Sequence, residues 1–219
     1  MSSVSDVWAV VPLKHTIHAK QRLAGALGAA LRQQLALAMA YDVLAALAAS
    51  PGLAGLAVVT LDPAASALAR SFGARVLTQG AADGQTGAVN AAAYTLSREG
   101  SGAMLTVPGD VPVITPLEVE QLIAAHDRRP DFVIAPAHDG RGSNAVLCAP
   151  PNAVRLQFGD DSFLPHLAAA RALGLEPKIV PLSGIGLDVD HPRDLAAFMG
   201  IPSQTRARTL LADARIMRR

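Results

Sequence analysis

The sequence is short of three features that each point to a particular class of protein: cysteine pairs, charge of one sign and long apolar runs. Its single cysteine, Cys148, excludes an internal disulfide and any multi-cysteine metal site, and apolar neighbours favour a buried structural thiol. The 19 basic and 18 acidic residues leave a net charge of +1, so no broad field favours nucleic acid or a membrane as partner. The longest apolar stretch, residues 35–49, is too short to span a bilayer.

The length and composition suit one domain with a sizeable core. The chain has 219 residues, of which 51% are hydrophobic, and no repeat, low-complexity tract or linker divides it. We therefore expect one domain over 1–219. Its basic tail, 203–219, is more simply a solvated helix face or chain end than a binding arm. The N-terminus lacks the pattern of a signal peptide, which predicts a cytoplasmic protein. Both a monomer and a homodimer are compatible with this sequence.

Short β-type runs alternate with longer, alanine-rich helical runs. The expected strands are residues 7–11, 55–60, 74–77, 103–107, 132–135, 144–149, 177–181 and 186–189. The expected helices are residues 26–49, a helix beginning at Asp62-Pro63, residues 87–98, a helix opened by a capping box at 115–118, and residues 162–173 and 192–199. This alternation predicts a doubly wound α/β domain with helices on both faces of a mainly parallel sheet. Ligands should therefore bind where strands end, near a topological switch point.

Three cations follow the first expected strand. Lys14, Lys20 and Arg22 lie in a loop that begins at Pro12. Backbone amides and cations at the carboxyl edge of a sheet suit a triphosphate. The alternative is an ordinary solvated loop. The segment is neither a Walker loop nor a Gly-x-Gly-x-x-Gly fingerprint, so neither of those mechanisms applies.

Three aspartates lie in or after apolar runs elsewhere. Asp110 stands between two prolines after the run 103–107, and Asp188 and Asp190 are two residues apart in an expected strand. Alternate residues of a strand share a side, so this pair should project together and repel unless a cation lies between them. The alternative for Asp190 is an N-cap to the helix that begins at Pro192. The three carboxylates predict a hard-cation site for Mg²⁺, or Mn²⁺.

Two turns place a glycine beside a hydroxyl group. The first contains Ser143 and Asn144, and the second contains Gly159 and Ser162 at an expected helix N-terminus. Free amides and a hydroxyl in such turns predict a phosphate or carboxylate site. A plain hairpin turn and an ordinary N-cap are the alternatives. His166, one turn inside the helix, would reach the same anion.

In this order and spacing, these segments resemble the 2-phospho-L-lactate guanylyltransferase family. The family includes the phosphoenolpyruvate and 3-phosphoglycerate guanylyltransferases of coenzyme F420 biosynthesis. The resemblance runs from about residue 7 to residue 198. It is carried by Val11-Pro12-Leu13-Lys14, Ala19-Lys20-Gln21-Arg22-Leu23, Gly87-Ala88-Val89-Asn90-Ala91, Pro108-Gly109-Asp110-Val111-Pro112, Gly142-Ser143-Asn144-Ala145, Phe158-Gly159 with Ser162-Phe163, and Leu187-Asp188-Val189-Asp190 with Pro192 and Asp194-Leu195.

The resemblance implies a nucleotide-diphospho-sugar transferase-like fold, with a mixed sheet flanked by helices. It implies transfer of GMP from GTP to 2-phospho-L-lactate, phosphoenolpyruvate or 3-phosphoglycerate, with release of pyrophosphate. The expected magnesium ligands are Asp110, Asp188 and Asp190, which with Lys20 form the expected catalytic set. The expected nucleotide contacts are Pro12, Lys14, Lys20, Arg22, Asn90, Pro108 and Gly109. The expected contacts of the phosphorylated acid are Ser143, Asn144, Gly159, Ser162 and His166.

The sequence departs from the family pattern at a few positions. Ser143 replaces the usual Thr, and Val89 replaces the usual Leu. Asp161, preceded by Asp160, replaces a small residue, and this negative charge should weaken anion binding unless both side chains point away. Two other functions stay open. One is a nucleotidyltransferase of the same fold that acts on a sugar phosphate or a molybdopterin-type acceptor, and the other is a catalytically silent GTP-binding module.

Overall fold

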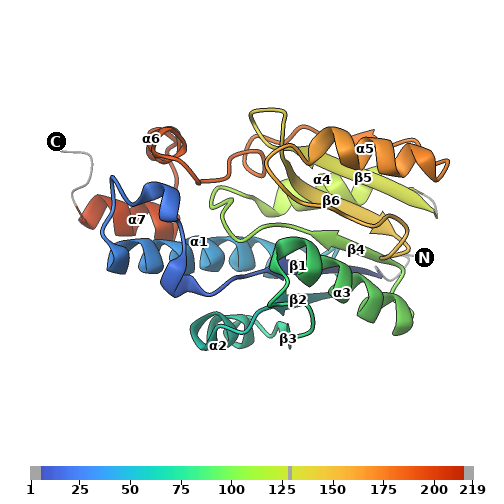
Figure 1. Ribbon diagram of the computed structural model, residues 1–219, viewed down its shortest axis with the longest axis horizontal. Coiled ribbons are helices and arrows are strands. Elements are labelled where there is room, and N and C mark those ends of the chain that lie inside the picture. The colour runs from blue at the N-terminus through green and yellow to red at the C-terminus, as the bar shows by residue number, and fades with distance from the viewer. Residues whose placement is uncertain (1–5, 128–129, 215–219) are drawn as a thin grey trace.

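A seven-stranded sheet forms the middle layer of the structure (Figure 1). The computed structural model describes residues 6–127 and 130–214. The strands are β1 (Val7–Pro12), β2 (Gly55–Val59), β3 (Arg75–Leu77), β4 (Ala103–Thr106), β5 (Asp131–Pro136), β6 (Ser143–Ala149) and β7 (Lys178–Ile179). They lie in the order β3-β2-β1-β4-β6-β5-β7, and of these seven only β6 runs antiparallel to its neighbours. The predicted mainly parallel, mixed sheet is confirmed.

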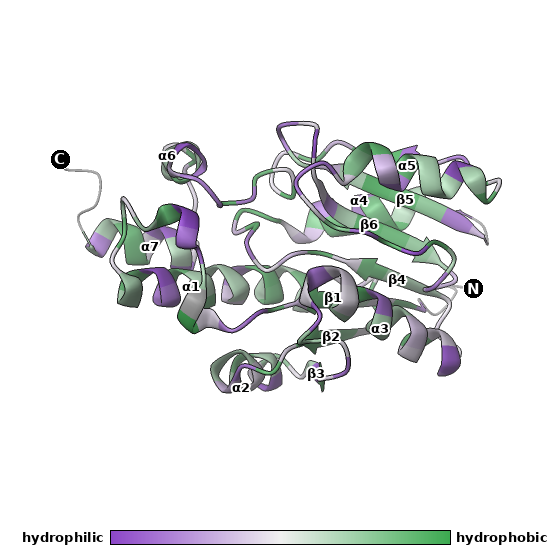
Figure 2. Cartoon of the chain, viewed as in Figure 1, coloured by the Kyte–Doolittle hydropathy of each residue, from purple (hydrophilic) through white to green (hydrophobic). Residues whose placement is uncertain are grey.

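Helices cover both faces of this sheet. They are α1 (Ala29–Ala48), α2 (Pro63–Ser71), α3 (Gly84–Arg98), α4 (Pro116–Ala125), α5 (Phe163–Ala172), α6 (Pro192–Gly200) and α7 (Arg206–Asp213). Alternate residues of β1 point to opposite faces, so Val7, Ala9 and Val11 pack with α1, α2 and α4, whereas Val10 packs with α3. The strands are hydrophobic along most of their length (Figure 2). Within the described residues, no helix is long and apolar enough to cross a membrane.

Most predicted elements form close to their predicted bounds, with one clear error. Residues 186–189 are not a strand, because no neighbouring segment pairs with them as a ladder. The N–H of Gly186 donates to the carbonyl of Leu182 within a turn, and the N–H of Val189 donates to the carbonyl of Asp110. Single hydrogen bonds, and not the ladder of a strand, therefore pair the N–H groups of Gly186 and Val189. The strand predicted over residues 177–181 is shorter in the structure, where β7 has only two residues.

The predicted buried thiol is confirmed. Cys148 lies in the fully buried strand β6, and burial raises the pKa of its thiol to about 12. A thiol that stays protonated at neutral pH is a poor nucleophile. Cys148 therefore contributes to packing.

The first part of the basic tail forms a helix that docks on α1. Ala207 and Leu211 of α7 are buried in an apolar cluster that is separate from those on the two faces of the sheet and also contains residues of α1 and α6. The carboxylate of Asp42 accepts the first two N–H groups of α7, and the guanidinium of Arg206 lies 3.3 Å from the ring centroid of Tyr41. This part of the tail belongs to the domain. Its last three arginines, Arg215, Arg218 and Arg219, lie outside the described residues.

The carboxyl ends of β1 and β4 lie where the order of the sheet reverses. From β1 the chain moves to β2 and β3 on one side, and it then returns to add β4 on the other side. Such a reversal leaves a crevice at the carboxyl edge, because the connections leave in opposite directions. This edge is the predicted place for a ligand.

Asp62 ties the loop after β1 to the start of α2. One carboxylate oxygen accepts the N–H groups of Ala64 and Ala65, which caps α2 as predicted. The other oxygen accepts the N–H and the hydroxyl of Thr16, both at 2.7 Å. Burial works against the charged carboxylate, but these four donors hold the pKa of Asp62 below its usual value. One buried side chain thus fixes both a helix and a loop of the crevice.

Asp62→Ala should lower the free energy of unfolding by about 2–4 kcal/mol, since it removes a helix cap and leaves the Thr16 donors unpaired. Urea denaturation measures this loss. Asp83→Ala is the matched control, because Asp83 is the N-cap residue of α3 but makes no capping hydrogen bond. Equal losses in the two variants would contradict the role given to Asp62.

Candidate active site

Two adjacent cavities open at the carboxyl edge of the sheet. The first has a volume of about 880 Å³ and lies beside the ends of β1, β2 and β4; the second has a volume of about 600 Å³ and extends toward the β5–β6 turn and α5. They share the wall residues Lys14, Arg22, Gly84, Gln85, Pro108, Asp110 and Asp190. Two ligands bound side by side would therefore meet at this wall.

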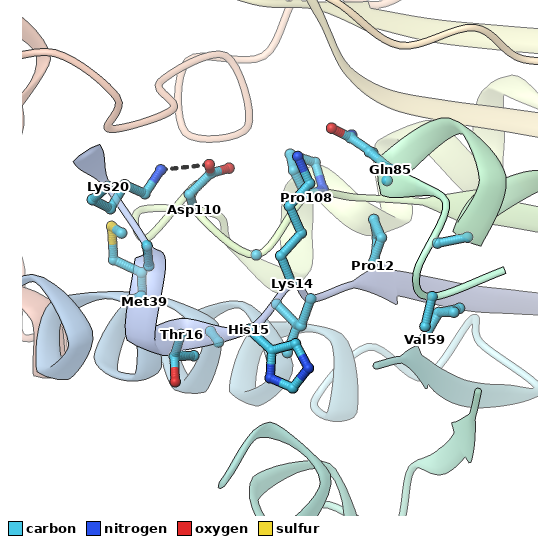
Figure 3. A pocket seen from close by; sticks show the side chains of 18 of the residues that line it. Pro12, Lys14, His15, Thr16, Lys20, Met39, Val59, Gln85, Pro108 and Asp110 are labelled. Atoms are coloured by element: carbon cyan, nitrogen blue, oxygen red, sulfur yellow. Dashed lines mark hydrogen bonds and ion pairs between the residues drawn. The ribbon is translucent and has the colours of Figure 1, made fainter. Parts of the chain in front are cut away.

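Lys20 lies between two aspartates of this wall. Its ammonium donates to Oδ2 of Asp110 and to Oδ1 of Asp190, both at 2.6 Å, and Figure 3 shows it directed at Asp110. Burial alone would lower the pKa of Lys20, but the two carboxylates outweigh it and raise the pKa above its usual value. The backbone of Lys20 is left-handed, with φ 54° and ψ 43°, which is costly for a residue with a side chain. The two ion pairs help to hold it there.

The third predicted aspartate joins the same group. Asp188 lines the second cavity with Asp110 and Asp190, and the side-chain amide of Asn144 donates to its Oδ1 at 3.0 Å. Burial, and then repulsion from Asp110 and Asp190, raise the pKa of Asp188 above its usual value. The three carboxylates therefore carry more negative charge than Lys20 neutralises.

The argument that brought Asp188 and Asp190 together from strand geometry was wrong, because residues 186–189 form no strand. The hydrogen bond between Val189 and the carbonyl of Asp110 brings the two segments together instead. The alternative role of Asp190 as an N-cap is also wrong. The N-cap residue of α6 is His191, and the carboxylate of Asp194 accepts its N–H at 2.7 Å.

The donor set suits a hard cation, although Lys20 holds one oxygen each of Asp110 and Asp190 and Arg22 lies 3.5 Å from the other oxygen of Asp190. Carboxylate oxygens are the ligands Mg²⁺ prefers, and Asp188 adds a third carboxylate whose pKa is raised first by burial and then by repulsion from Asp110 and Asp190. Within residues 6–127 and 130–214, no group of three histidine, cysteine or acidic side chains is arranged as a metal site. The carboxylate chemistry of Asp110, Asp188 and Asp190 fits the predicted ion. Their assignment as ligands of Mg²⁺ stays a proposal.

The two unexpected aspartates of the 158–163 turn are both paired with arginine. Asp161 accepts from Nε of Arg141 at 2.6 Å, and Asp160 lies 3.3 Å from Arg22. Arg22 also lies 3.5 Å from Asp190, so it links the turn to the aspartate group. The expected penalty on anion binding is therefore reduced, because both charges are neutralised at the rim of the second cavity.

Ser143 and Ser162 meet at the base of the second cavity. The N–H of Ser143 donates to Oγ of Ser162 at 3.1 Å, and the two hydroxyl oxygens are 3.3 Å apart. Asn144 and Gly159 line the same cavity. Four of the five residues predicted for the acid thus gather here, on β6 and at the start of α5. His166 is not among the lining residues, and its ring lies below Ser143 with Nδ1 3.0 Å from the Ser143 hydroxyl.

The side chain of Asn90, a predicted nucleotide contact, is held by hydrogen bonds within the protein. Its amide donates to the carbonyls of Thr86 and Leu156, both at 2.8 Å, and its Oδ1 accepts the N–H of Leu156. It lines neither cavity. Asn90 therefore fastens α3 to the segment that leads to the second cavity. The other predicted nucleotide contacts, Pro12, Lys14, Lys20, Arg22, Pro108 and Gly109, all line the first cavity.

Two residues at the start of α3 were missed. Gly84 and Gln85 line both cavities, and Figure 3 shows Gln85 at the first cavity on a different element from Lys14. Gly84 has φ +73°, a conformation that favours glycine. An Asp-Gly turn signal at 83–84 was present in the sequence, but the helix was predicted to begin only at residue 87.

The fold is that of nucleotidyltransferases and nucleotide-diphospho-sugar transferases. The structure is similar to a Desulfovibrio desulfuricans protein assigned to the nucleotide-diphospho-sugar transferases, with a TM-score of 0.77 and 19% identity over 97% of both chains. It is also similar to a 4-diphosphocytidyl-2C-methyl-D-erythritol synthase, with a TM-score of 0.62 and 15% identity over 94% of this chain and 99% of the other. At these identities the likeness shows the fold alone.

The sequence defines the family more narrowly. Residues 7–218 match the family described as guanylyl transferase CofC-like. The chain is 40% identical over 210 residues to the phosphoenolpyruvate guanylyltransferase of Roseiflexus castenholzii, with 95% of each chain covered. It is 33% identical over 207 residues to the 2-phospho-L-lactate guanylyltransferase of Methanothermobacter thermautotrophicus, with 94% of this chain and 90% of the relative covered. The protein belongs to the guanylyl transferase CofC-like family, as its motifs predicted.

Lys20→Met should lower the free energy of unfolding at neutral pH by ~1–3 kcal/mol, because Asp110 and Asp190 lose the cation that they share. Lys20 helps to hold the pKa of Asp190 below its usual value, so its contribution is present at neutral pH and is lost as carboxylates protonate. The difference from wild type should therefore narrow below about pH 5. Urea denaturation at several pH values checks this, with exposed Lys14→Met as control. A loss independent of pH would contradict it.

Proposed function

We propose that this protein transfers GMP from GTP to a small phosphorylated acid and releases pyrophosphate. The observation that carries the proposal is the wall shared by the two cavities, whose Asp110 and Asp190 are joined by Lys20 from the side of the first cavity. Two adjacent sites with a charged wall between them suit a reaction that joins two anionic substrates. The names of the guanylyltransferase relatives support the same reaction.

GTP suits the first cavity. Three cations line it, Lys14, Lys20 and Arg22, and a triphosphate needs such charge to offset its own. Apolar side chains from β2 and α1 line the rest, and they would pack against the base and ribose. The phosphorylated acid suits the second cavity, which Ser143, Gly159 and Ser162 line and where the Ser143 hydroxyl is left to donate.

The proposed reaction needs no general base. A phosphate monoester has a second pKa near ~6, so the acid carries a nucleophilic phosphate oxygen at neutral pH. This oxygen attacks the α-phosphorus of GTP and forms a new P–O bond. The bond from the α-phosphorus to the bridging oxygen of the β-phosphate breaks, and pyrophosphate leaves with that electron pair. Lys14, Lys20 and Arg22 would stabilise the charge that develops on pyrophosphate.

Asp110, Asp188 and Asp190 would hold Mg²⁺, or Mn²⁺ in its place. When bound, the ion would neutralise phosphate charge and align the two substrates. The protein's own residues supply the remaining effects. Asn144 orients Asp188, Lys20 neutralises part of the aspartate group, and the shared wall brings the reacting phosphates together.

Phosphoenolpyruvate is the first acceptor to test, because the 40% identical relative is named for it. The alternatives are 2-phospho-L-lactate and 3-phosphoglycerate, which differ from it by a few atoms. A role in coenzyme F420 biosynthesis, a cytoplasmic location and the choice between monomer and homodimer stay predictions.

Purified protein with GTP and Mg²⁺ should release pyrophosphate with one of these three acids, at least about tenfold above the rate without acceptor. A coupled pyrophosphate assay with parallel GTP and ATP reactions measures this. Release only with a sugar phosphate or a pterin acceptor would replace the proposed substrate class. GTP binding without pyrophosphate release from any acceptor would instead favour the silent GTP-binding module.

Asp188→Asn should lower kcat by at least ~100-fold and leave the fold intact. Asparagine keeps an oxygen that accepts from Asn144, so the main change is the lost charge. Asp127→Asn is the control, since Asp127 forms an exposed ion pair with Lys178 and lines neither cavity. Near-normal turnover of Asp188→Asn at limiting Mg²⁺ would rule out the proposed role of Asp188 in metal binding.

A further inference from the structure

His166 contacts the proposed acceptor site from behind. It lies on α5 with only 1% of its surface exposed, and it touches two segments that line the second cavity. Its Nδ1 is 3.0 Å from Oγ of Ser143, and its Nε2 is 2.9 Å from the backbone N of Gln157. The ring also packs edge-on against Phe158, with centroids 5.1 Å apart. The residue is thus placed to act on the acceptor through a neighbour.

The backbone determines which nitrogen of His166 carries the proton. The N–H of Gln157 is always a donor, so Nε2 must accept and carries no hydrogen. Burial lowers the pKa of His166 to about 4, so the ring is neutral at physiological pH. The single ring proton therefore lies on Nδ1, and Nδ1 donates to the Ser143 hydroxyl oxygen.

This donation determines the direction of the Ser143 hydroxyl. Its oxygen accepts from Nδ1 of His166 and from the hydroxyl of Ser162, and these two bonds fill its accepting capacity. The proton of Ser143 is left to donate to another partner, and Ser143 lines the second cavity. A hydroxyl fixed in this way offers a donor to an anion and no free lone pair.

We propose that His166 is a positioning residue that holds the Ser143 hydroxyl as a hydrogen-bond donor to the anionic acceptor. This inference rests on the proposed function and extends it to a residue that does not touch the substrate. It also gives the buried ring a role in acceptor affinity in addition to packing. The competing account is purely structural: His166 only anchors the segment 157–159 through the N–H of Gln157.

Two substitutions separate the two accounts, because each keeps one of the two hydrogen bonds of the His166 ring and removes the other. In His166→Asn, the amide nitrogen takes the place of Nδ1 and still donates to Ser143, but the Gln157 N–H loses its acceptor. In His166→Gln, the carbonyl takes the place of Nε2 and still accepts from Gln157, but Ser143 loses its donor. Positioning predicts that His166→Gln is the more harmful variant for the acceptor, and anchoring predicts the reverse.

His166→Gln should raise the KM for the acceptor about 10-fold to 100-fold, the effect of losing a hydrogen bond to a charged group, while the KM for GTP stays within about threefold. His166→Asn should recover most of this loss. Steady-state pyrophosphate release with the acceptor that wild type uses measures both values. His166→Gln with a wild-type acceptor KM, or a larger rise in His166→Asn, would overturn the inference.

A double-mutant cycle distinguishes an effect that His166 exerts through Ser143 from general damage to the fold. If His166 acts through Ser143, adding His166→Gln to Ser143→Ala should raise the acceptor KM no further. Independent, additive effects would contradict the coupling. Chemical denaturation of each variant gives its stability separately.

The ring proton is measurable without activity. Nitrogen-15 NMR of the histidine side chains at pH 7 should show His166 protonated on Nδ1 alone, with His166→Gln assigning the signal. The opposite tautomer, or a charged ring, would overturn the inference even in an active enzyme. A wild-type protein that releases no pyrophosphate with any acid would instead overturn the proposed function, and the donation to the acceptor with it.

Discussion

The charge pairing of Lys20 with Asp110 and Asp190 organises this end of the molecule. It joins the loop after β1, the loop after β4 and the segment before α6, which are far apart in the sequence. A buried ammonium is costly unless it is paired, so these contacts strongly favour one arrangement of the three segments. Asp110 and Asp190 line both cavities, and Lys20 lines the first. The shape of the site and its electrostatics therefore depend on the same three side chains.

Negative charge in the second cavity is distributed in a way that suits an anionic ligand. Asp160 and Asp161 reach arginines at the rim, and the base of the cavity presents neutral hydroxyl and amide groups. Three further carboxylates, Asp110, Asp188 and Asp190, line the same cavity where the proposed cation would bind. Neutral donors and the carboxylates of the proposed cation site thus lie in different parts of one cavity. A reaction between two phosphate groups needs both donors and a cation, because like charges repel at close range.

The sequence predicted what depends on local pattern and missed what depends on contacts between distant segments. Alternation and capping residues predicted the helices and most strands, since the helix caps made by Asp62 and Thr115 join groups only a few positions apart. Residues 186–189 have a strand-like composition but find no partner strand. Asn90 and His166 were predicted as ligand contacts, yet their polar atoms face backbone and side chains from other segments. No periodicity in the sequence indicates such partners.

The most direct test of this account is a crystal structure of the protein with Mg²⁺ and a non-hydrolysable GTP analogue. The account predicts that the phosphates lie in the first cavity against Lys14, Lys20 and Arg22, with the cation on Asp110, Asp188 and Asp190. Nucleotide bound outside the first cavity, or a cation held by residues other than these aspartates, would contradict the account.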